Sequence, residues 1–453
     1  MYLLYEQYKL MTKQELSVGL GFFAIFFATQ SIATMAVPYY HMVLGVDPFL
    51  LGATLTLPIL ISAVFNPWLG KLFDVNPLLQ NRSWVVFIFG WLTALLFGAV
   101  WMAPVSWGES SILLFLFVVL TLFSLSLTIL TLASRCIVFE NIQTQDKRRF
   151  QFGVIAFFEK LGAIIYFWFF PISQLIFVGN VYNGVRVVGW TVAFFLIGIL
   201  TSVMARAFRH QRHKLSNART IQIQDLPKVD EIPKAFVKRV RLILFHVFLM
   251  FAILGLCVSL DYYLIVYFMF NGNIELGSLW KGILSTSYAV IGIAFIPIAI
   301  KVSRVQDEYR VLRYAYAMAL IGGPLKWIIF QPGNEFALII DALLGAAAWT
   351  AMATTIPTML AALSEQTEKK YGISVSGYLN ARYDLVLKVS AVVSLLVSGL
   401  ILNVIGFDAS LGANQASDTL HRMRLIFSVG STIVLIFLLL LTIKQNRQQL
   451  ITV

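Results

Sequence analysis

The sequence is poor in charged residues and nearly free of cysteine. Charged residues make up 12% of the 453 positions, whereas hydrophobic residues make up 59%. A soluble domain carries about 25% charged residues, so this composition excludes an ordinary soluble enzyme or binding domain and indicates repeated crossing of a lipid bilayer. The two cysteines, Cys136 and Cys257, lie in apolar segments, where we expect them to pack rather than to form a disulfide or bind a metal.

Signatures of enzymes and of nucleotide-driven pumps are also missing. The sequence has no Walker motif, no Gly-x-Ser-x-Gly, no His-Glu-x-x-His and no Cys-x-x-Cys. We therefore predict that the protein is not an enzyme and has no catalytic residues, no cofactor and no metal site. The net charge of +12 follows from Lys and Arg in cytoplasmic loops, so no nucleic-acid partner is expected.

Twelve apolar stretches are each long enough to cross a hydrocarbon core of about 30 Å as a helix. They lie at 17–43, 48–73, 83–106, 110–138, 153–177, 185–207, 241–270, 278–301, 309–330, 335–364, 372–404 and 421–444. The predicted fold class is an all-α membrane protein with twelve transmembrane helices. Lys and Arg follow the even-numbered stretches, so both termini and the central loop are expected to be cytoplasmic.

One long polar segment divides the apolar sequence into two halves. Residues 206–241 contain ten Lys or Arg and three Asp or Glu. We predict an N-terminal six-helix bundle at 1–205, this segment as a basic cytoplasmic linker, and a C-terminal six-helix bundle at 242–453. Two groups of six helices with both ends inside is the layout of the major facilitator superfamily, in which the substrate site lies between the halves.

The end of the second stretch carries the most specific motif. It reads Asn66-Pro67-Trp68-Leu69-Gly70-Lys71-Leu72-Phe73-Asp74 and is followed by Arg82. The Gly-x-x-x-Asp and the later Arg resemble the superfamily's signature between helices 2 and 3, so Gly70, Asp74 and Arg82 are predicted to form a gate. The Asn-Pro-x-x-Gly resembles the Asp-Pro-x-x-Gly of the glycoside–pentoside–hexuronide:cation symporters, the family of melibiose permease.

The sequence departs from that family at the cation site. The resemblance implies two aspartates in helix 2, but Ser62 and Asn66 stand at the matching positions. Phe26 and Thr131 stand where the family has its sugar-contacting aspartates, whereas Lys388 is retained. The resemblance therefore implies the fold and a transport function, and sodium coupling is not expected.

Polar residues within the apolar stretches mark the candidate substrate site. A charged side chain at the bilayer centre costs about 2.5–3.5 kcal/mol on insertion scales, so each one requires a partner or an aqueous cavity. Asp384 and Lys388 can pair within their helix, either to let it insert or to set a charge in the cavity. The hydroxyls of helix 4 either line the cavity or pack helix against helix. The predicted substrate-binding residues are Gln30, Thr34, Ser124, Thr128, Thr131, Arg135, Trp349, Asp384 and Lys388.

Three carboxylates are candidates for proton coupling: Glu159, Asp341 and Asp384. Glu159 is also placed to bridge to Arg135. Asp341 belongs with Asp261 and Lys326 to a set of charges near helix ends, which fit an outer gate network and side chains extending to the interface equally well.

We predict a secondary active transporter that moves a polar organic solute (a sugar, a glycoside or an anionic sugar derivative) by alternating access. It is expected to be a monomer and a multi-pass protein of the cell membrane, here the bacterial inner or plasma membrane. Its partners are the lipid bilayer and a small-molecule or lipid-like substrate. One alternative is a flippase or exporter of a glycolipid or lysolipid, and another is a non-transporting scaffold or receptor that uses the basic segment to bind partners or anionic lipids.

Overall fold

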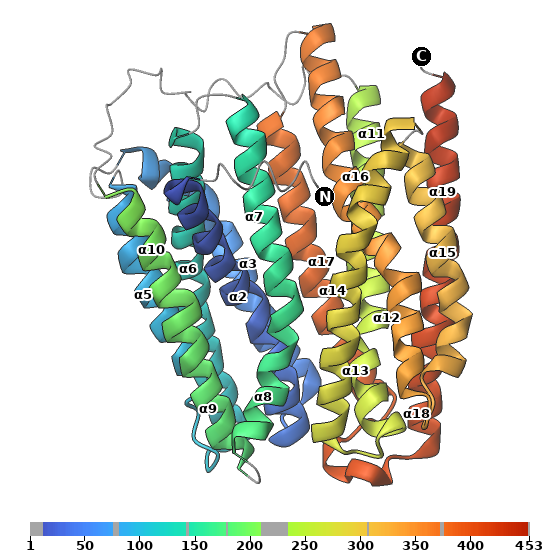
Figure 1. Ribbon diagram of the computed structural model, residues 1–453. Helices are drawn as coiled ribbons and strands as arrows, with labels where there is room; N and C mark the ends of the chain where they lie inside the picture. Colours follow the sequence, from blue (N-terminus) through green and yellow to red (C-terminus); the bar gives the residue numbers. More distant parts are fainter. Residues whose placement is uncertain are drawn as a thin grey trace. The chain divides into compact units, whose positions relative to one another are not determined.

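The computed structural model describes residues 12–75, 81–141, 145–177, 180–209, 234–305, 308–371 and 376–451. All regular structure in these ranges is helical, as predicted (Figure 1). The chain divides into two compact units, Met1–Lys214 and Leu215–Val453.

The described part of the N-terminal unit contains six consecutive helical rods. The first begins with a capping box, in which the Thr12 backbone N–H donates to the Glu15 carboxylate at 2.8 Å. The rods are α2 with η1 (Lys13–Ala36, Val37–Val43), α3 (Pro48–Val75), α5 (Arg82–Val100), α6 (Glu109–Asn141), α7 with η2 and α8 (Gln145–Ile165, Tyr166–Trp168, Phe169–Ile176), and α9 with η3 and α10 (Val181–Thr191, Val192–Ile199, Leu200–Ala207).

The described part of the C-terminal unit also contains six rods. Its first helix, α11, begins at Lys234, inside the predicted linker, and residues 210–233 of that linker lie outside the described ranges. The rods are α11 with η6, α12, α13 and η7 (Lys234–Phe248, Leu249–Leu254, Gly255–Ser259, Asp261–Tyr263, Leu264–Met269), α14 (Ile274–Val305), α15 (Glu308–Ile329), η8 with α16 (Glu335–Ala337, Leu338–Tyr371), α17 (Ser376–Val404), and α18 with η10 and α19 (Ser417–Leu425, Ile426–Gly430, Ser431–Ile451), with the short η9 (Ala409–Asn414) before α18.

The two units repeat one packing pattern. In the N-terminal unit, α6 packs against α3 and α5, α2 packs against α7 and α10, and α5 packs against η3. In the C-terminal unit, α16 packs against α14 and α15, η6 packs against α17 and α19, and α15 packs against α19. When the rods of each unit are numbered one to six in chain order, rod 4 packs against rods 2 and 3, rod 1 packs against rods 5 and 6, and rod 3 packs against rod 6 in both units. This is an internal structural repeat that the sequence does not reveal.

Small residues allow close packing in the N-terminal unit. A β-carbon added at Gly98 would collide with the Trp190 ring, and one added at Gly189 would collide with Trp101. These contacts bring α5 against α9, because a glycine leaves room for an aromatic ring on the facing helix.

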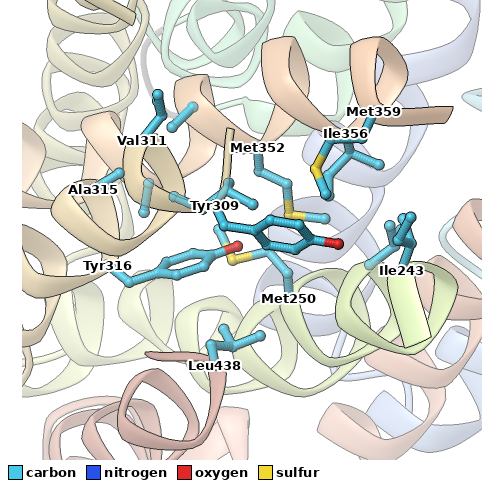
Figure 2. Close-up of a cluster of buried hydrophobic side chains, with 14 of the residues drawn as sticks. Ile243, Met250, Tyr309, Val311, Ala315, Tyr316, Met352, Ile356, Met359 and Leu438 are labelled. Carbon is cyan, nitrogen blue, oxygen red and sulfur yellow. The ribbon is translucent and has the colours of Figure 1, made fainter. Parts of the chain in front are cut away.

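A continuous apolar core holds the C-terminal unit together. It brings residues of α11 and η6 together with residues of α15, α16 and α19. Figure 2 shows Tyr309 and Tyr316 of α15 beside Met250 and Met352 within this cluster. Leu379 of α17 also belongs to the cluster, so this core joins five of the unit's six rods and supports the polar groups described below.

Ten helices in the described residues are long and apolar enough to cross a membrane. The remaining two predicted stretches correspond to α7 with α8, which η2 interrupts, and to α15, which carries several Arg and Lys residues. The protein is thus an all-α, multi-span membrane protein, whereas twelve crossings and cytoplasmic termini stay predictions. One predicted boundary is wrong: the third helix ends at Val100 rather than at 106, since a turn begins at Trp101.

Candidate functional site

Helix α6 carries the predicted hydroxyl stripe on a face of its own. Its exposed apolar side chains (Leu114, Val118 and Leu122) and its fully buried ones (Leu116, Leu130 and Ala133) lie on two other faces. At about 100° per residue, the stripe points roughly 110° from the exposed face and roughly 135° from the buried one. The stripe therefore faces neither the core of the unit nor the most exposed apolar side.

The side chains of this stripe differ in exposure. Ser124, Thr128 and Thr131 are half-buried, and Arg135 is exposed. The Thr131 hydroxyl donates to the Leu127 carbonyl at 2.8 Å, so its own helix satisfies it. By contrast Ser126, outside the stripe, is buried and shares a 2.8 Å hydrogen bond with the Thr93 hydroxyl of α5. The hydroxyl that bonds to a neighbouring helix is thus on another face of α6, and the cavity-lining role of the stripe stays a prediction.

Arg135 and Glu159 do not form the predicted bridge. The described ion pairs do not include one between them. Glu159 is exposed on α7, and its carboxylate lies within the electrostatic range of Lys160 and Arg135. The three charges are near one another at the surface of the N-terminal unit without direct contact.

The remaining predicted residues of this unit are less informative. On α2, Gln30 is exposed, and the Thr34 hydroxyl donates to the Ser31 carbonyl at 3.0 Å. Of the predicted gate, Arg82 is buried at the start of α5. The surroundings of Gly70 and of the Asp74 side chain are not described, so the gate stays a prediction.

In the C-terminal unit the predicted site residues do not form a described cluster. Trp349 packs edge-on against Phe251, with ring centroids 5.5 Å apart. Lys388 is half-buried and Arg382 is exposed on α17. The Asp384 side chain lies outside the described residues, so its predicted pairing with Lys388 stays a prediction.

Two buried ion pairs form the best-defined polar site of the molecule. Lys281 Nζ of α14 lies 2.7 and 2.6 Å from the two carboxylate oxygens of Asp261 on α13. Lys326 Nζ of α15 lies 2.9 Å from Asp341 Oδ1 on α16. Asp261 and Asp341 are only 4% and 3% exposed, so these charges are removed from solvent and held by their partners.

Tyr288 and two phenylalanines complete this site. The Tyr288 hydroxyl of α14 donates to Asp341 Oδ2 at 2.8 Å, and it also lies in the electrostatic range of Asp261. Lys326 Nζ lies 4.2 Å from the centroid of the Phe427 ring and 5.7 Å from that of Phe330. The group comprising Asp261, Lys281, Tyr288, Lys326, Phe330, Asp341 and Phe427 is called the paired-charge site below.

Asp261, Lys326 and Asp341 are paired and buried rather than extended toward an interface. An outer gate formed by these residues stays a prediction. Lys281 and Tyr288 were missed, although a signal for Lys281 exists. Asp261 and Lys281 lie nearly equally far from the turn at Gly272, and Lys326 and Asp341 are equally spaced about the turn near Gly333. Antiparallel helices joined by a tight turn bring such residues to the same height.

The described residues contain no group of three or more His, Cys, Asp or Glu side chains that could hold a metal ion. Neither cysteine forms a disulfide; Cys136 is half-buried and Cys257 is buried.

Comparisons with known proteins agree with this architecture. A family model described as MFS/sugar transport protein matches residues 17–445. The chain is 20% identical over 442 residues to the "Uncharacterized symporter YnaJ" of Bacillus subtilis (strain 168), with 96% of this chain and 91% of that protein covered.

Two solved structures are similar over nearly the whole chain. One is the crystal structure of the nucleoside transporter NupG, with a TM-score of 0.64, 15% identity, and 95% of this chain and 99% of that chain covered. The other is that of a bacterial homologue of the iron transporter ferroportin in an inward-facing state, with a TM-score of 0.67, 14% identity, and 95% and 98% covered. At these identities the likeness shows the fold.

Proposed function

The chain belongs to the MFS/sugar transport protein family, and from that premise we propose that it moves a sugar, a glycoside or an anionic sugar derivative across the membrane by alternating access. The family makes the chain a multi-pass membrane transporter and not an enzyme. The class of solute and the residues that bind it are our proposal.

The observation that carries the proposal is the separate polar face of α6. Its half-buried hydroxyls can exchange hydrogen bonds with the hydroxyls of a sugar, and the exposed Arg135 guanidinium can hold a carboxylate in a bidentate pair. Gln30, Thr34, Trp349, Asp384 and Lys388 are proposed as further contacts. The basic charge of Arg135 and Lys388 favours a substrate with an anionic group.

We extend the proposal to cation coupling, because the Bacillus subtilis relative is named a symporter. Sodium binding at helix α3 is not favoured, since the uncharged Ser62 and Asn66 stand where the symporter family that the sequence resembles has two aspartates. We therefore propose coupling to protons. Gly70, Asp74 and Arg82 are proposed as the gate, and the part of the basic segment 206–241 between α10 and α11 is proposed as a cytoplasmic linker between two six-helix bundles.

Uptake by the purified protein in proteoliposomes tests this function. We would use D-glucuronate, neutral methyl glycosides and a fluorescent lysolipid as probes. An Arg135→Gln variant is expected to lose glucuronate uptake by about tenfold or more, because a hydrogen-bonded charge pair is lost. The matched control is Arg206→Gln, which alters an exposed arginine at the end of α10 and is expected to transport normally.

The outcomes separate the alternatives. Glucuronate uptake that depends on Arg135 supports the proposal. Movement of the lysolipid alone would replace it with a flippase, and movement of no probe would favour a scaffold or receptor.

A further inference from the structure

We propose that Asp341 is the group at which this transporter binds and releases a proton, with Lys326 and Tyr288 as the partners that make this exchange possible. The inference rests on the proposed transport function. It narrows the three candidate carboxylates to one and assigns a role to the paired-charge site.

Asp341 differs from Glu159 in its surroundings. Glu159 is exposed on α7. Asp341 is 3% exposed, and side chains of two other helices bond to its two oxygens. A change in the charge of Asp341 therefore acts at once on α14, α15 and α16.

Lys326 has a second environment that can hold its charge. Its ammonium group lies 2.9 Å from Asp341 and 4.2 Å from the centre of the Phe427 ring. When a proton cancels the charge of Asp341, the faces of Phe427 and Phe330 still stabilise the ammonium by cation–π attraction. A purely structural ion pair does not require this second set of contacts.

Tyr288 can serve both states of the carboxyl group. Its hydroxyl donates to the ionised carboxylate, and the same hydroxyl can accept a hydrogen bond from the protonated acid. Gly345, one turn after Asp341 on α16, makes room for the Tyr288 hydroxyl, because a β-carbon at position 345 would collide with it.

The second pair, Asp261 with Lys281, has a different set of hydrogen bonds from the pair of Lys326 and Asp341. Lys281 lies within hydrogen-bonding distance of both oxygens of Asp261, so one ammonium group engages the whole carboxylate, whereas the two oxygens of Asp341 bond to side chains of two different helices. The pair of Asp261 and Lys281 therefore serves as the matched control.

The other ionisable side chains on the helices around Asp341 have environments of their own, so Asp341 is the group that we propose changes its charge. Cys257 of α12 lies within the electrostatic range of Lys326. Arg424 of α18 is held by Trp327, whose carbonyl accepts from it at 2.8 Å. His246 of α11 is bonded to Tyr316 within the apolar core at 2.6 Å, and α17 has no ionisable residue between 390 and 404.

The proposed step is a simple proton transfer. A proton from water on one side of the membrane adds to a carboxylate oxygen of Asp341, forming an O–H bond and cancelling one negative charge. Lys326 stays an ammonium ion, so the two pairs change from neutral to a net charge of one. Release of the same proton to the opposite side restores the ion pair.

Infrared titration tests this step without any sugar. The full-length protein in lipid nanodiscs is titrated with acid while the carboxylic-acid C=O stretch of buried groups is recorded. We expect a titrating band in the wild type and in the D261N/K281Q variant, and we expect its loss in D341N/K326Q. The double changes are chosen because they leave no unpaired charge behind. A band that persists in D341N/K326Q overturns the proposal.

A single substitution provides a second test if the double variant does not fold. Tyr288→Phe removes a donor that stabilises the ionised form, so protonation becomes easier and the band is expected at higher pH than in the wild type. A band at the same pH would contradict the role of Tyr288 as a switching partner.

Transport measurements distinguish a failure of this inference from a failure of the proposed function. With D-glucuronate as the probe, D341N/K326Q is expected to retain exchange across the membrane but to lose accumulation driven by a pH gradient. Proton-driven uptake in D341N/K326Q refutes the inference alone. A titrating Asp341 in a protein that moves no sugar refutes the proposed function alone.

Discussion

At the scale of single residues, the paired-charge site shows why a charge can be kept inside an apolar helix bundle. Each carboxylate of the site lies within 3 Å of an ammonium group, and one of them also accepts from Tyr288. Such pairs give little net stability, because the cost of removing two ions from water offsets their attraction. Their retention is more easily explained by a role in the function than by stability.

Removing only one member of a buried ion pair is expected to destabilise the protein. Lys281→Ala leaves the Asp261 carboxylate buried without its partner, and we expect a loss of about 3–5 kcal/mol in the free energy of unfolding. The D261N/K281Q variant, which removes both charges, is expected to unfold much nearer the wild-type temperature. Thermal unfolding in detergent measures both, and an unchanged midpoint for Lys281→Ala would contradict the burial of this pair.

Gly345 is predicted to position Tyr288. Gly345→Ala places a β-carbon against the Tyr288 hydroxyl, so the ring must move away from Asp341 and thermal stability is expected to fall. Gly292→Ala is the matched control on α14, because its β-carbon would meet only the Thr350 hydroxyl, at 3.0 Å. Equal unfolding temperatures for the two variants would argue against the contact between Gly345 and Tyr288.

At the scale of helices, the turns between antiparallel rods determine which charges meet. The turn at Asn271 and Gly272 has φ angles of 49° and 77°, and Gly333 in the next turn of this kind has φ 85°. Glycine adopts such angles at little cost, whereas other residues are strained there. These two turns place Asp261 beside Lys281 and Lys326 beside Asp341.

The two turns are expected to respond differently to alanine. Gly333→Ala adds strain only, since no atom lies within 4 Å of its β-carbon position, and about 1 kcal/mol is expected. Gly272→Ala adds a collision with the backbone of Gly412 and Ala413, so its unfolding midpoint should fall further. A larger fall in the unfolding midpoint for Gly333→Ala than for Gly272→Ala would contradict the packing of the η9 loop against the turn at Gly272.

The sequence predicts helices better than contacts. Long apolar runs identify the rods, because a membrane helix must be apolar for about 20 residues. Polar first turns at Lys13 and Ser417 were left out of the predicted stretches, since they interrupt the apolar run. The Arg135–Glu159 bridge was expected because helices 4 and 5 are consecutive in the sequence, but α6 and α7 are not among the closely packed helix pairs of the described residues, and the pair is not formed.

Part of the paired-charge site could have been predicted from the sequence. The equal spacing of Asp261 and Lys281 about a turn is visible in the sequence alone. Tyr288 and Phe427 could not be identified in this way, because their contacts depend on how four separate helices pack.

At the scale of the whole molecule, the repeated packing of the two units is the main result. Five helix pairings recur in both, although the sequence shows no internal repeat. Packing contacts depend on size and spacing of side chains rather than on identity, so a repeat can persist in structure after it is lost from the sequence.

The orientation of the chain in the membrane is predicted from its loop charges. In a variant with Cys136 and Cys257 replaced by alanine, a cysteine at Ser106 is expected to react with an impermeant maleimide added outside intact cells. A cysteine at Ser216, in the basic segment, is expected to react only after the cells are permeabilised. The reverse pattern would invert the predicted topology.

The most direct test of the account is the uptake of D-glucuronate into proteoliposomes under an imposed pH gradient. We predict accumulation above the external concentration, its collapse on addition of a protonophore, and a loss of about tenfold or more in Arg135→Gln. Uptake that never exceeds equilibrium, or that is unchanged by the protonophore, would contradict proton-coupled transport of a polar solute by this protein.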